Sequence, residues 1–165
     1  MYRNNISGNN ITEINKKEPD DMNNDDKELL GGIFKLSETG MESTKAVMPK
    51  VKEQQLKNEL QEQYNDYCEA KSKTEQALVD AGVFPEEPGM LSKAAMWGSI
   101  QLKTLAEQSS DHIAEMMING TTMGIVDLTK HLGACQNANK SVREYAQSFI
   151  RNEERHIDNL KAFLA

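Results

Sequence analysis

The sequence predicts an all-α protein, specifically an antiparallel four-helix bundle, and three observations support this prediction. Apolar residues recur at alternating spacings of three and four through several long stretches, which is the period of one buried helix face. Aromatic residues make up only 5% of the chain, whereas Glu, Lys, Gln, Leu, Met and Ala, which favour helices, are common. Short segments with Pro or Gly separate the periodic stretches, as expected for helices joined by loops in a bundle.

The first 24 residues differ in composition from the rest of the chain, because they are rich in Asn, Asp and Lys and poor in apolar residues. Such a segment cannot bury enough apolar surface to offset the entropy lost on ordering, so residues 1–24 are expected to be a disordered polar tail. Residues 25–165 then form the bundle, which has the size of one ordinary domain.

The first helix is expected to begin at Asp25, which is followed by Glu28 as in a capping pattern, and Pro49 is expected to end it or to open the next helix. The second is expected over residues 50–81, with Gly82 as its C-cap. The expected buried positions are Leu30, Ile33, Phe34, Ser37, Met41, Thr44 and Met48 in the first helix, and Leu60, Tyr64, Tyr67, Lys71, Thr74, Leu78 and Ala81 in the second.

Residues 83–89 (VFPEEPG) form a short Pro-rich loop, which we expect to join antiparallel neighbours. The third helix is expected to begin near Met90. Asn119 and Gly120 should break or kink it, and a further short helix is expected over residues 121–133. The expected buried positions are Leu91, Ala95, Gly98, Leu102, Leu105, Ser109, His112 and Met116, with Trp97 beside them at a helix–helix contact, and Met123 and Val126 in the short helix.

The final helix, expected over residues 141–165, has the most regular apolar face. Ser141 and Glu144 form the pattern of a capping box at its start. Its expected buried stripe is Val142, Ala146, Phe149, Glu153, His156, Leu160 and Phe163. Glu153 and His156 are the polar members of this stripe, and a spacing of three places them on the same side of the helix. A carboxylate and an imidazole directed at a core need a ligand or hydrogen-bonding partners.

A Glu-x-x-His pair on an inward helix face is typical of sites for two iron or manganese ions, which bundles hold with about four carboxylates and two histidines from four helices. His112 and Glu115, also three residues apart, are candidate ligands on the third helix, and Glu38 is the candidate on the first. The alternative is a polar core, in which Glu153 pairs with Lys71 and the imidazole of the same motif is hydrogen-bonded to a tyrosine. A third interpretation leaves Glu153 in a solvated part of the stripe.

Composition excludes several other classes of function. The formal net charge is -7 and no stretch concentrates Lys and Arg, so a nucleic-acid partner is not expected. No run of about 18 apolar residues or signal-peptide core occurs, so no membrane association is expected. Cys68 and Cys135 lie far apart, which fits a reducing, cytoplasmic compartment. His131 stands at a helix end without activating neighbours, which favours an electrostatic role over phosphoryl transfer. The sequence also contains no phosphate-binding loop and no nucleophile elbow.

Two stretches, HIAEMMINGTTMGIVDLTK (112–130) and LKNELQEQYNDY (56–67), resemble the ferritin-like superfamily, with a likeness to small uncharacterised bundle proteins of low-GC Gram-positive bacteria, some of them related to spore-coat proteins. The resemblance covers most of the chain apart from the tail and implies a ferritin-like bundle. Family members with intact sites bind iron or manganese and act as oxidases, peroxidases or stores.

Glu153 and His156 match the last-helix motif of that superfamily. The second helix departs from it, with Asn65 three residues after Glu62 where a histidine is expected, and the long crossover of ferritins between helices two and three is missing. The leading expectation is therefore a non-catalytic or weakly metal-binding ferritin-like protein, cytoplasmic or sporulation-associated, that forms homo-oligomers. The alternatives are a di-iron or di-manganese oxidoreductase and a module that offers a Met-rich groove to a partner helix.

Overall fold

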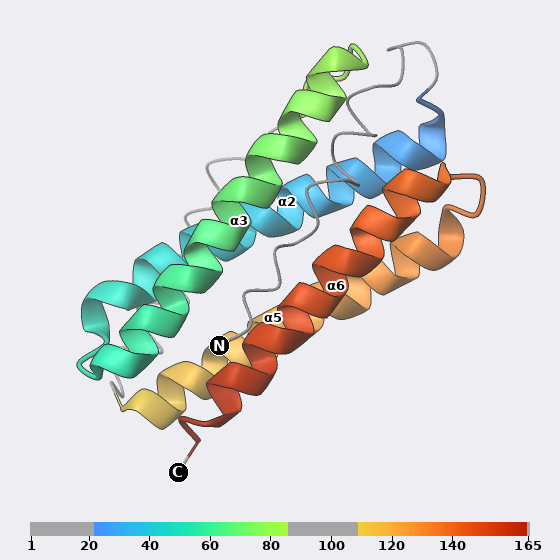
Figure 1. Cartoon of the computed structure of the whole chain (residues 1–165). Coiled ribbons are helices and arrows are strands. Elements are labelled where there is room, and N and C mark those ends of the chain that lie inside the picture. Colours follow the sequence, from blue (N-terminus) through green and yellow to red (C-terminus); the bar gives the residue numbers. More distant parts are fainter. Residues whose placement is uncertain (1–21, 86–108, 165) are drawn as a thin grey trace.

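The computed structural model describes residues 22–85 and 109–164 of the chain. Within these ranges the secondary structure is helical and no strand occurs, which confirms the prediction of an all-α fold for this part of the chain. The elements are α2 (Asn24–Val47), the 3-10 helix η2 (Met48–Lys50), α3 (Gln54–Asp80), α5 (Ser110–Ala134) and α6 (Lys140–Lys161) (Figure 1). None of these helices combines the length and the apolar character that a membrane span requires.

Three predictions concern residues outside the described ranges. The first is the disorder of the predicted tail over residues 1–24, of which residues 1–21 lie outside. The others are the apolar stripe over residues 91–105 and the burial of Trp97. These stay predictions.

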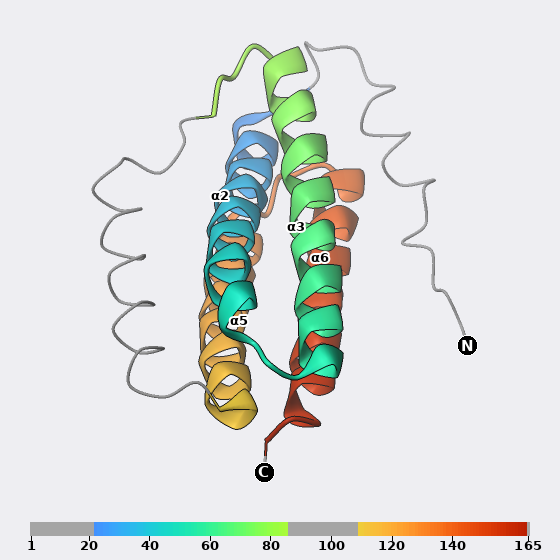
Figure 2. The same cartoon turned by 90° about the vertical axis from the view of Figure 1, so that its left-hand side faces the viewer.

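Two apolar clusters, one near each end, hold the four long helices together. The first cluster includes at least one fully buried residue from each helix, for example Leu30, Leu78, Leu128 and Ala146. The second does the same with Val47, Leu56, Ile113 and Leu160. The first cluster thus contains residues from the N-terminal halves of α2 and α6 and from the C-terminal halves of α3 and α5. The second cluster contains residues from the other half of each helix. It follows that α2 and α6 run in one direction and α3 and α5 in the other (Figures 1 and 2).

The connection from α3 to α5 differs from the expectation. Since α3 ends at the first cluster and α5 begins at the second, the chain between Pro85 and Ser109 joins opposite ends of the bundle. The third long helix also does not run unbroken from Met90 to Met116, because Ser109 is the N-cap of α5 and has an extended backbone. The expectation that the bundle lacks a long connection between its second and third helices is therefore wrong.

Helix α5 is continuous from Ser110 to Ala134, so the predicted break at Asn119 and Gly120 and the separate short helix over 121–133 are wrong. Its buried residues are Ile113, Ala114, Met117, Thr121 and Leu128. Met123 and Val126, which were expected to be buried, are 74% and 48% exposed. The helix tolerates its glycines because the cost of about 1 kcal/mol each is offset by packing. Gly124, for example, allows a close approach of Leu36 from α2.

Caps were predicted at three helix termini, and one of these three predictions is correct. Gly82 has a φ of 72° and follows the C-cap of α3, as expected. At the start of α2 the capping box is made by Asn23 and Asp26 and not by Asp25 and Glu28. Helix α6 begins at Lys140 after Asn139, so the predicted Ser141–Glu144 box is also wrong.

The turn between α5 and α6 is docked on the start of α2. The backbone N–H of Asn139 donates to the Oδ1 atom of Asp26 at 2.6 Å, and the N–H of Asn137 donates to the Oδ2 atom of Asp25 at 2.8 Å. The buried Asp26 carboxylate accepts from the backbone N–H of Asn23 at the start of its own helix and also fixes the neighbouring turn, which explains why it can be fully buried.

Candidate functional site

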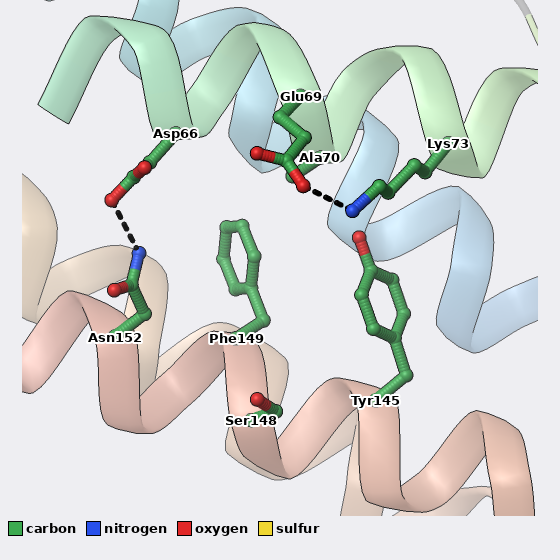
Figure 3. Close-up of a pocket in the computed structure, with 8 residues that line it drawn as sticks. All are labelled: Asp66, Glu69, Ala70, Lys73, Tyr145, Ser148, Phe149 and Asn152. Atoms are coloured by element: carbon green, nitrogen blue, oxygen red, sulfur yellow. Dashed lines mark hydrogen bonds and ion pairs between the residues drawn. The ribbon is translucent and has the colours of Figure 1, made fainter. Parts of the chain in front are cut away.

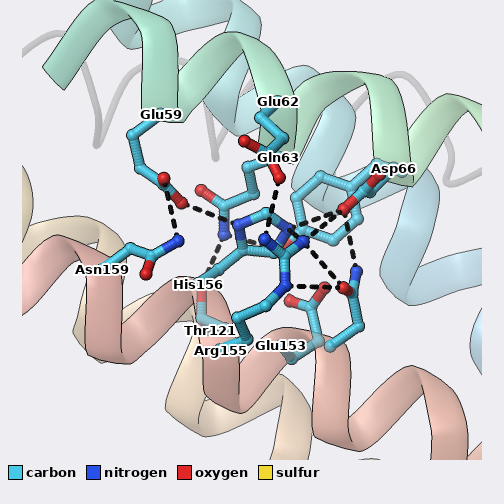
Figure 4. Close-up of polar contacts among 11 residues, drawn as sticks. Glu59, Glu62, Gln63, Asp66, Thr121, Glu153, Arg155, His156 and Asn159 are labelled. Carbon is cyan, nitrogen blue, oxygen red and sulfur yellow. Dashed lines mark hydrogen bonds and ion pairs between the residues drawn. The ribbon is translucent and has the colours of Figure 1, made fainter. Parts of the chain in front are cut away.

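A layer of polar side chains crosses the bundle between the two apolar clusters, mainly between the antiparallel helices α3 and α6 (Figure 4). We call it the polar layer. Its members are Glu59, Gln63, Asp66 and Tyr67 from α3, Thr121 from α5, and Glu153 and His156 from α6. The last two are buried, as the stripe of the final helix predicted.

His156 lies at the centre of the layer, with a side chain that is 0% exposed. Its Nδ1 atom is 2.8 Å from the Oε1 atom of Glu59, and its Nε2 atom is 2.9 Å from the Oδ2 atom of Asp66. An ionised carboxylate only accepts hydrogen bonds, so both ring nitrogens must carry a proton. Burial opposes this charge, but the hydrogen bonds to Asp66 and Glu59 outweigh it and raise the pKa of His156 to about 9.

The two carboxylates that hold His156 are fixed by further donors on α6. Asn159 donates to Glu59 at 3.0 Å, while Asn152 and Arg155 donate to Asp66 at 3.0 and 3.1 Å. Burial raises the pKa of Asp66, but the hydrogen bonds from His156 and Asn152 and the nearby Arg155 charge lower it overall. Arg155 also donates to the exposed Glu62 at 2.8 Å, so the network joins three carboxylates to one imidazolium and one guanidinium.

Glu153 forms the second part of the layer. Its Oε2 atom accepts a hydrogen bond of 2.5 Å from the Tyr67 hydroxyl. Burial raises the pKa of Glu153 to about 7, although this hydrogen bond acts in the opposite direction. Burial and the nearby Glu153 also raise the pKa of Tyr67 well above its usual value, so the phenol stays a donor.

Neutral groups complete this second part. The Gln63 amide donates to the Tyr67 hydroxyl at 3.2 Å and lies 3.3 Å from the hydroxyl of Thr121 on α5. Among the described residues, the Oε1 atoms of Gln63 and Glu153 are buried without a hydrogen-bond partner. An ionised Glu153 with one unsatisfied oxygen is costly, which agrees with its raised pKa.

Helix α2 positions the phenol through a glycine. A Cβ atom added at Gly40 would fall far inside contact distance of the Tyr67 ring. Only a residue without a side chain therefore allows the ring to lie against α2 and to point its hydroxyl at Glu153.

The alternative interpretation, a polar core around Glu153 and His156, is confirmed, but the hydrogen-bond partners of these two residues differ from the predicted ones. Glu153 takes Tyr67 as its partner and not Lys71, and His156 is held by carboxylates and not by a tyrosine. Lys71 lies 3.6 Å from the buried carboxylate of Glu38 and 5.4 Å from the centre of the Phe34 ring. The interpretation that Glu153 is solvated is also wrong, because its side chain is buried.

The other candidate ligands lie apart from His156. Glu38 is buried on α2 beside Lys71. His112 is half-buried and Glu115 exposed near the start of α5, and Thr121, which this helix contributes to the layer, lies about 13 Å beyond His112 and about 9 Å beyond Glu115 along the axis. On α3 the inward pair is Gln63 and Asp66, whereas Glu62 and Asn65 are exposed.

The polar layer does not fit a pair of metal ions. A metal-bound imidazole must be neutral with one nitrogen available, whereas both nitrogens of His156 are bound to carboxylates. The α3 pair is Gln-x-x-Asp in place of Glu-x-x-His. In the part of the chain that the structure describes, no three His, Cys, Asp or Glu side chains are grouped so that they could hold a metal ion.

A small hollow lies between α3 and α6 beside Asp66, and the ion pair between Glu69 and Lys73 lies at its edge (Figure 3). Its volume is about 20 Å³, which is space for about one water molecule. Organic ligands need clefts of about 300 Å³ or more, so this hollow is not a site for such a ligand.

No protein-family model matches the sequence, and no curated protein or solved structure is similar enough to count as a match.

Proposed function

We propose that this protein is a non-catalytic bundle of the ferritin-like kind, in which a protonated histidine supplies the positive charge that a metal centre supplies in active relatives. The observation that carries the proposal is the pair of hydrogen bonds from His156 to Glu59 and Asp66. Metal binding there would require loss of a ring proton and of at least one of these bonds, which opposes it.

The charges of the layer support the same conclusion. His156 faces both Glu59 and Asp66, and Arg155 is shared between Asp66 and the exposed Glu62, so each carboxylate that holds the imidazole already has a cation beside it. Glu153, with a pKa of about 7, is about half protonated near that pH, which reduces its value as a ligand. The layer then serves to fix the register of α3 against α6, since its hydrogen bonds form only in one alignment of the two helices.

The test is the metal content of protein purified without chelator, together with thermal unfolding in the presence of iron(II) or manganese(II). We expect less than one ion per chain and no rise in melting temperature. The control is Glu154→Ala, which removes an exposed carboxylate next to Glu153 on α6. About two bound ions per chain, with a metal-dependent rise in melting temperature that Glu153→Ala abolishes and Glu154→Ala preserves, would support the di-metal oxidoreductase instead.

A further inference from the structure

The outward side of α5 carries a stretch without charge. Between Glu115 and Asp127 every exposed residue of the helix is neutral. These residues, which we call the α5 patch, are Asn119, Gly120, Thr122, Met123 and Val126. Met123, at 74% exposed, and Val126, at 48%, are large apolar side chains in the middle of a helix. A second surface placed on the patch would remove this apolar area from water, which is favourable.

The outward sides of the other three long helices that the structure describes differ from this patch. Each carries exposed or half-exposed charged residues along its length, namely Glu28, Lys35, Glu42 and Lys45 on α2, Lys57, Glu62 and Glu69 on α3, and Arg151, Glu154, Arg155 and Asp158 on α6. A bundle helix normally buries one apolar stripe and exposes charged residues opposite it. The α5 patch therefore has the composition of a contact surface and not of a solvated one.

Charges of opposite sign stand at the two ends of the patch. Glu115 precedes it, Lys130 follows it, and both side chains are exposed. At 3.6 residues per turn, one sector of about 80° around the helix axis contains Glu115, Asn119, Met123, Val126 and Lys130. The two charged residues are about 22 Å apart along the axis, so they cannot pair with each other. Neither makes an ion pair with another described residue, so both are available to a partner.

This order of charges is complementary to itself when a second copy lies antiparallel. A two-fold axis that is perpendicular to α5 and passes beside Met123 has Glu115 eight residues to one side and Lys130 seven residues to the other, or about 12 and 10 Å. The axis therefore brings Glu115 of each copy next to Lys130 of the other, and the same ion pair forms twice. A parallel pairing of the two helices would instead place like charges opposite each other.

The side chains near this axis suit a close approach of two helices. Met123 of one copy meets Met123 of the other, and methionine adapts its shape to an irregular gap. Gly120 is open to solvent, and no atom lies within 4 Å of a Cβ atom added to it, so this side of α5 does not obstruct a neighbouring helix. Asp127, the charged residue beside the patch, already lies 3.8 Å from the Nε2 atom of His131 in its own helix.

We propose that two copies of this chain form a symmetric antiparallel dimer through the α5 patch, with Met123 and Val126 at its centre and Glu115–Lys130 ion pairs between the copies at both ends. The contact is about 22 Å long and one helix diameter, or about 10 Å, wide. Such an area is at the lower end for specific interfaces, so we expect a dissociation constant in the micromolar range. The dimer does not depend on metal content and so is independent of the function proposed above.

The first test is the molar mass in solution over a range of about 1 to 500 µM, which brackets a micromolar dissociation constant. Light scattering or sedimentation of the parent should show a rise from the 18.5 kDa of one chain toward twice that mass. The double variant Met123→Asp with Val126→Asp should remain a monomer throughout, because the dimer would bury four unpaired carboxylates. Phe84→Asp is the matched control, since Phe84 is also exposed (78%) but lies outside α5, and it should associate like the parent.

Charge reversal tests the antiparallel geometry. Glu115→Lys alone, or Lys130→Glu alone, places like charges together at both ends and should weaken association about tenfold. The combined variant Glu115→Lys with Lys130→Glu restores opposite charges and should recover most of the parent's affinity. Glu75→Lys makes the same change of net charge at an exposed position of α3, which packs mainly against α2 and α6, and should leave the affinity unchanged. Circular dichroism should show the same helical content in every variant, since all the changes lie at exposed positions.

Three results would overturn the proposal. The first is a parent protein that remains a monomer up to about 500 µM. If Met123 of that monomer also resists oxidation by hydrogen peroxide, another part of the same chain covers the patch. The second is association that Met123→Asp with Val126→Asp leaves unchanged, which would place the contact between copies on another surface. The third is a combined charge reversal that binds no better than the single reversals, which would exclude the antiparallel ion pairs.

Discussion

At the scale of single residues, the contact between Tyr67 and Glu153 leaves a buried carboxylate only half satisfied by hydrogen bonds. The hydroxyl satisfies one carboxylate oxygen at 2.5 Å, while the other oxygen is buried without a partner among the described residues. Tyr67→Phe would remove the only donor that the described residues offer this carboxylate and should lower the free energy of unfolding by about 1–3 kcal/mol, as measured by urea denaturation. Tyr145→Phe is the control, because that hydroxyl makes no hydrogen bond to a described residue. Equal losses in the two variants would contradict the account.

The protonation of Glu153 gives a second prediction. Its pKa of about 7 in the folded protein is above its ordinary value of 4.5, so the folded state binds more protons between these values. Its contribution to stability is fully present below pH 4.5 and is lost as the pH rises through 7. Glu153→Gln keeps an acceptor for Tyr67 and cannot ionise. The stability of this variant relative to the parent should therefore improve by about 2–3 kcal/mol from pH 5 to pH 8.

Denaturant titrations of both proteins at several pH values measure this difference. Glu154→Gln, at the exposed neighbour, should show no such trend. A relative stability of Glu153→Gln that stays constant from pH 5 to pH 8 would mean that Glu153 is ionised throughout and that its burial is compensated in another way.

At the scale of elements, α6 shows what sequence alone can predict. Its stripe from Val142 to Leu160 is buried as expected, because charged residues occupy most of the other faces and leave one apolar direction. In α5 the stretch MINGTTMGIV has no charged residue on any face, so the spacing of apolar residues does not define one buried side. The helix buries Met117 and Thr121 and exposes Met123. Which side of the helix is buried depends on its contacts with α2, α3 and α6.

The partners of His156 show the same limit. Glu59 and Asp66 look like ordinary surface carboxylates in the sequence, and their meeting with His156 depends on the alignment of α3 with α6. Their spacing of seven residues, which places both on one side of a helix, is the only signal that could have indicated them. The burial of Glu153 and His156 could be predicted from the sequence, but their hydrogen-bond partners could not.

The contact of α2 with α3 gives a prediction at this scale. Gly40→Ala should lower the free energy of unfolding by about 1–3 kcal/mol, because the new methyl group and the rigid Tyr67 ring cannot occupy the same space. Gly31→Ala is a matched control in the same helix. No atom of a described neighbour lies within 4 Å of the added Cβ, so it should raise stability by about 0.5–1 kcal/mol through reduced backbone entropy. Thermal or urea unfolding of the two variants measures both values, and a neutral Gly40→Ala would contradict the described packing of Tyr67.

At the scale of the whole molecule, the bundle consists of two apolar ends separated by a polar layer. The ends supply the burial that holds the helices together, while the layer specifies their alignment. The expectation of a homo-oligomer stays a prediction, and light scattering across a range of concentrations measures it.

The central claim is that His156 is a doubly protonated cation held by Glu59 and Asp66, and NMR of its ring nitrogens tests this claim most directly. The chain has three histidines, so His156→Gln assigns the signal. The account predicts that both ring nitrogens remain protonated through neutral pH and titrate with a pKa of about 9, and that added zinc(II) or iron(II) leaves them unchanged. A pKa near or below the ordinary 6.5, or a ring nitrogen that loses its proton when metal is added, would contradict it.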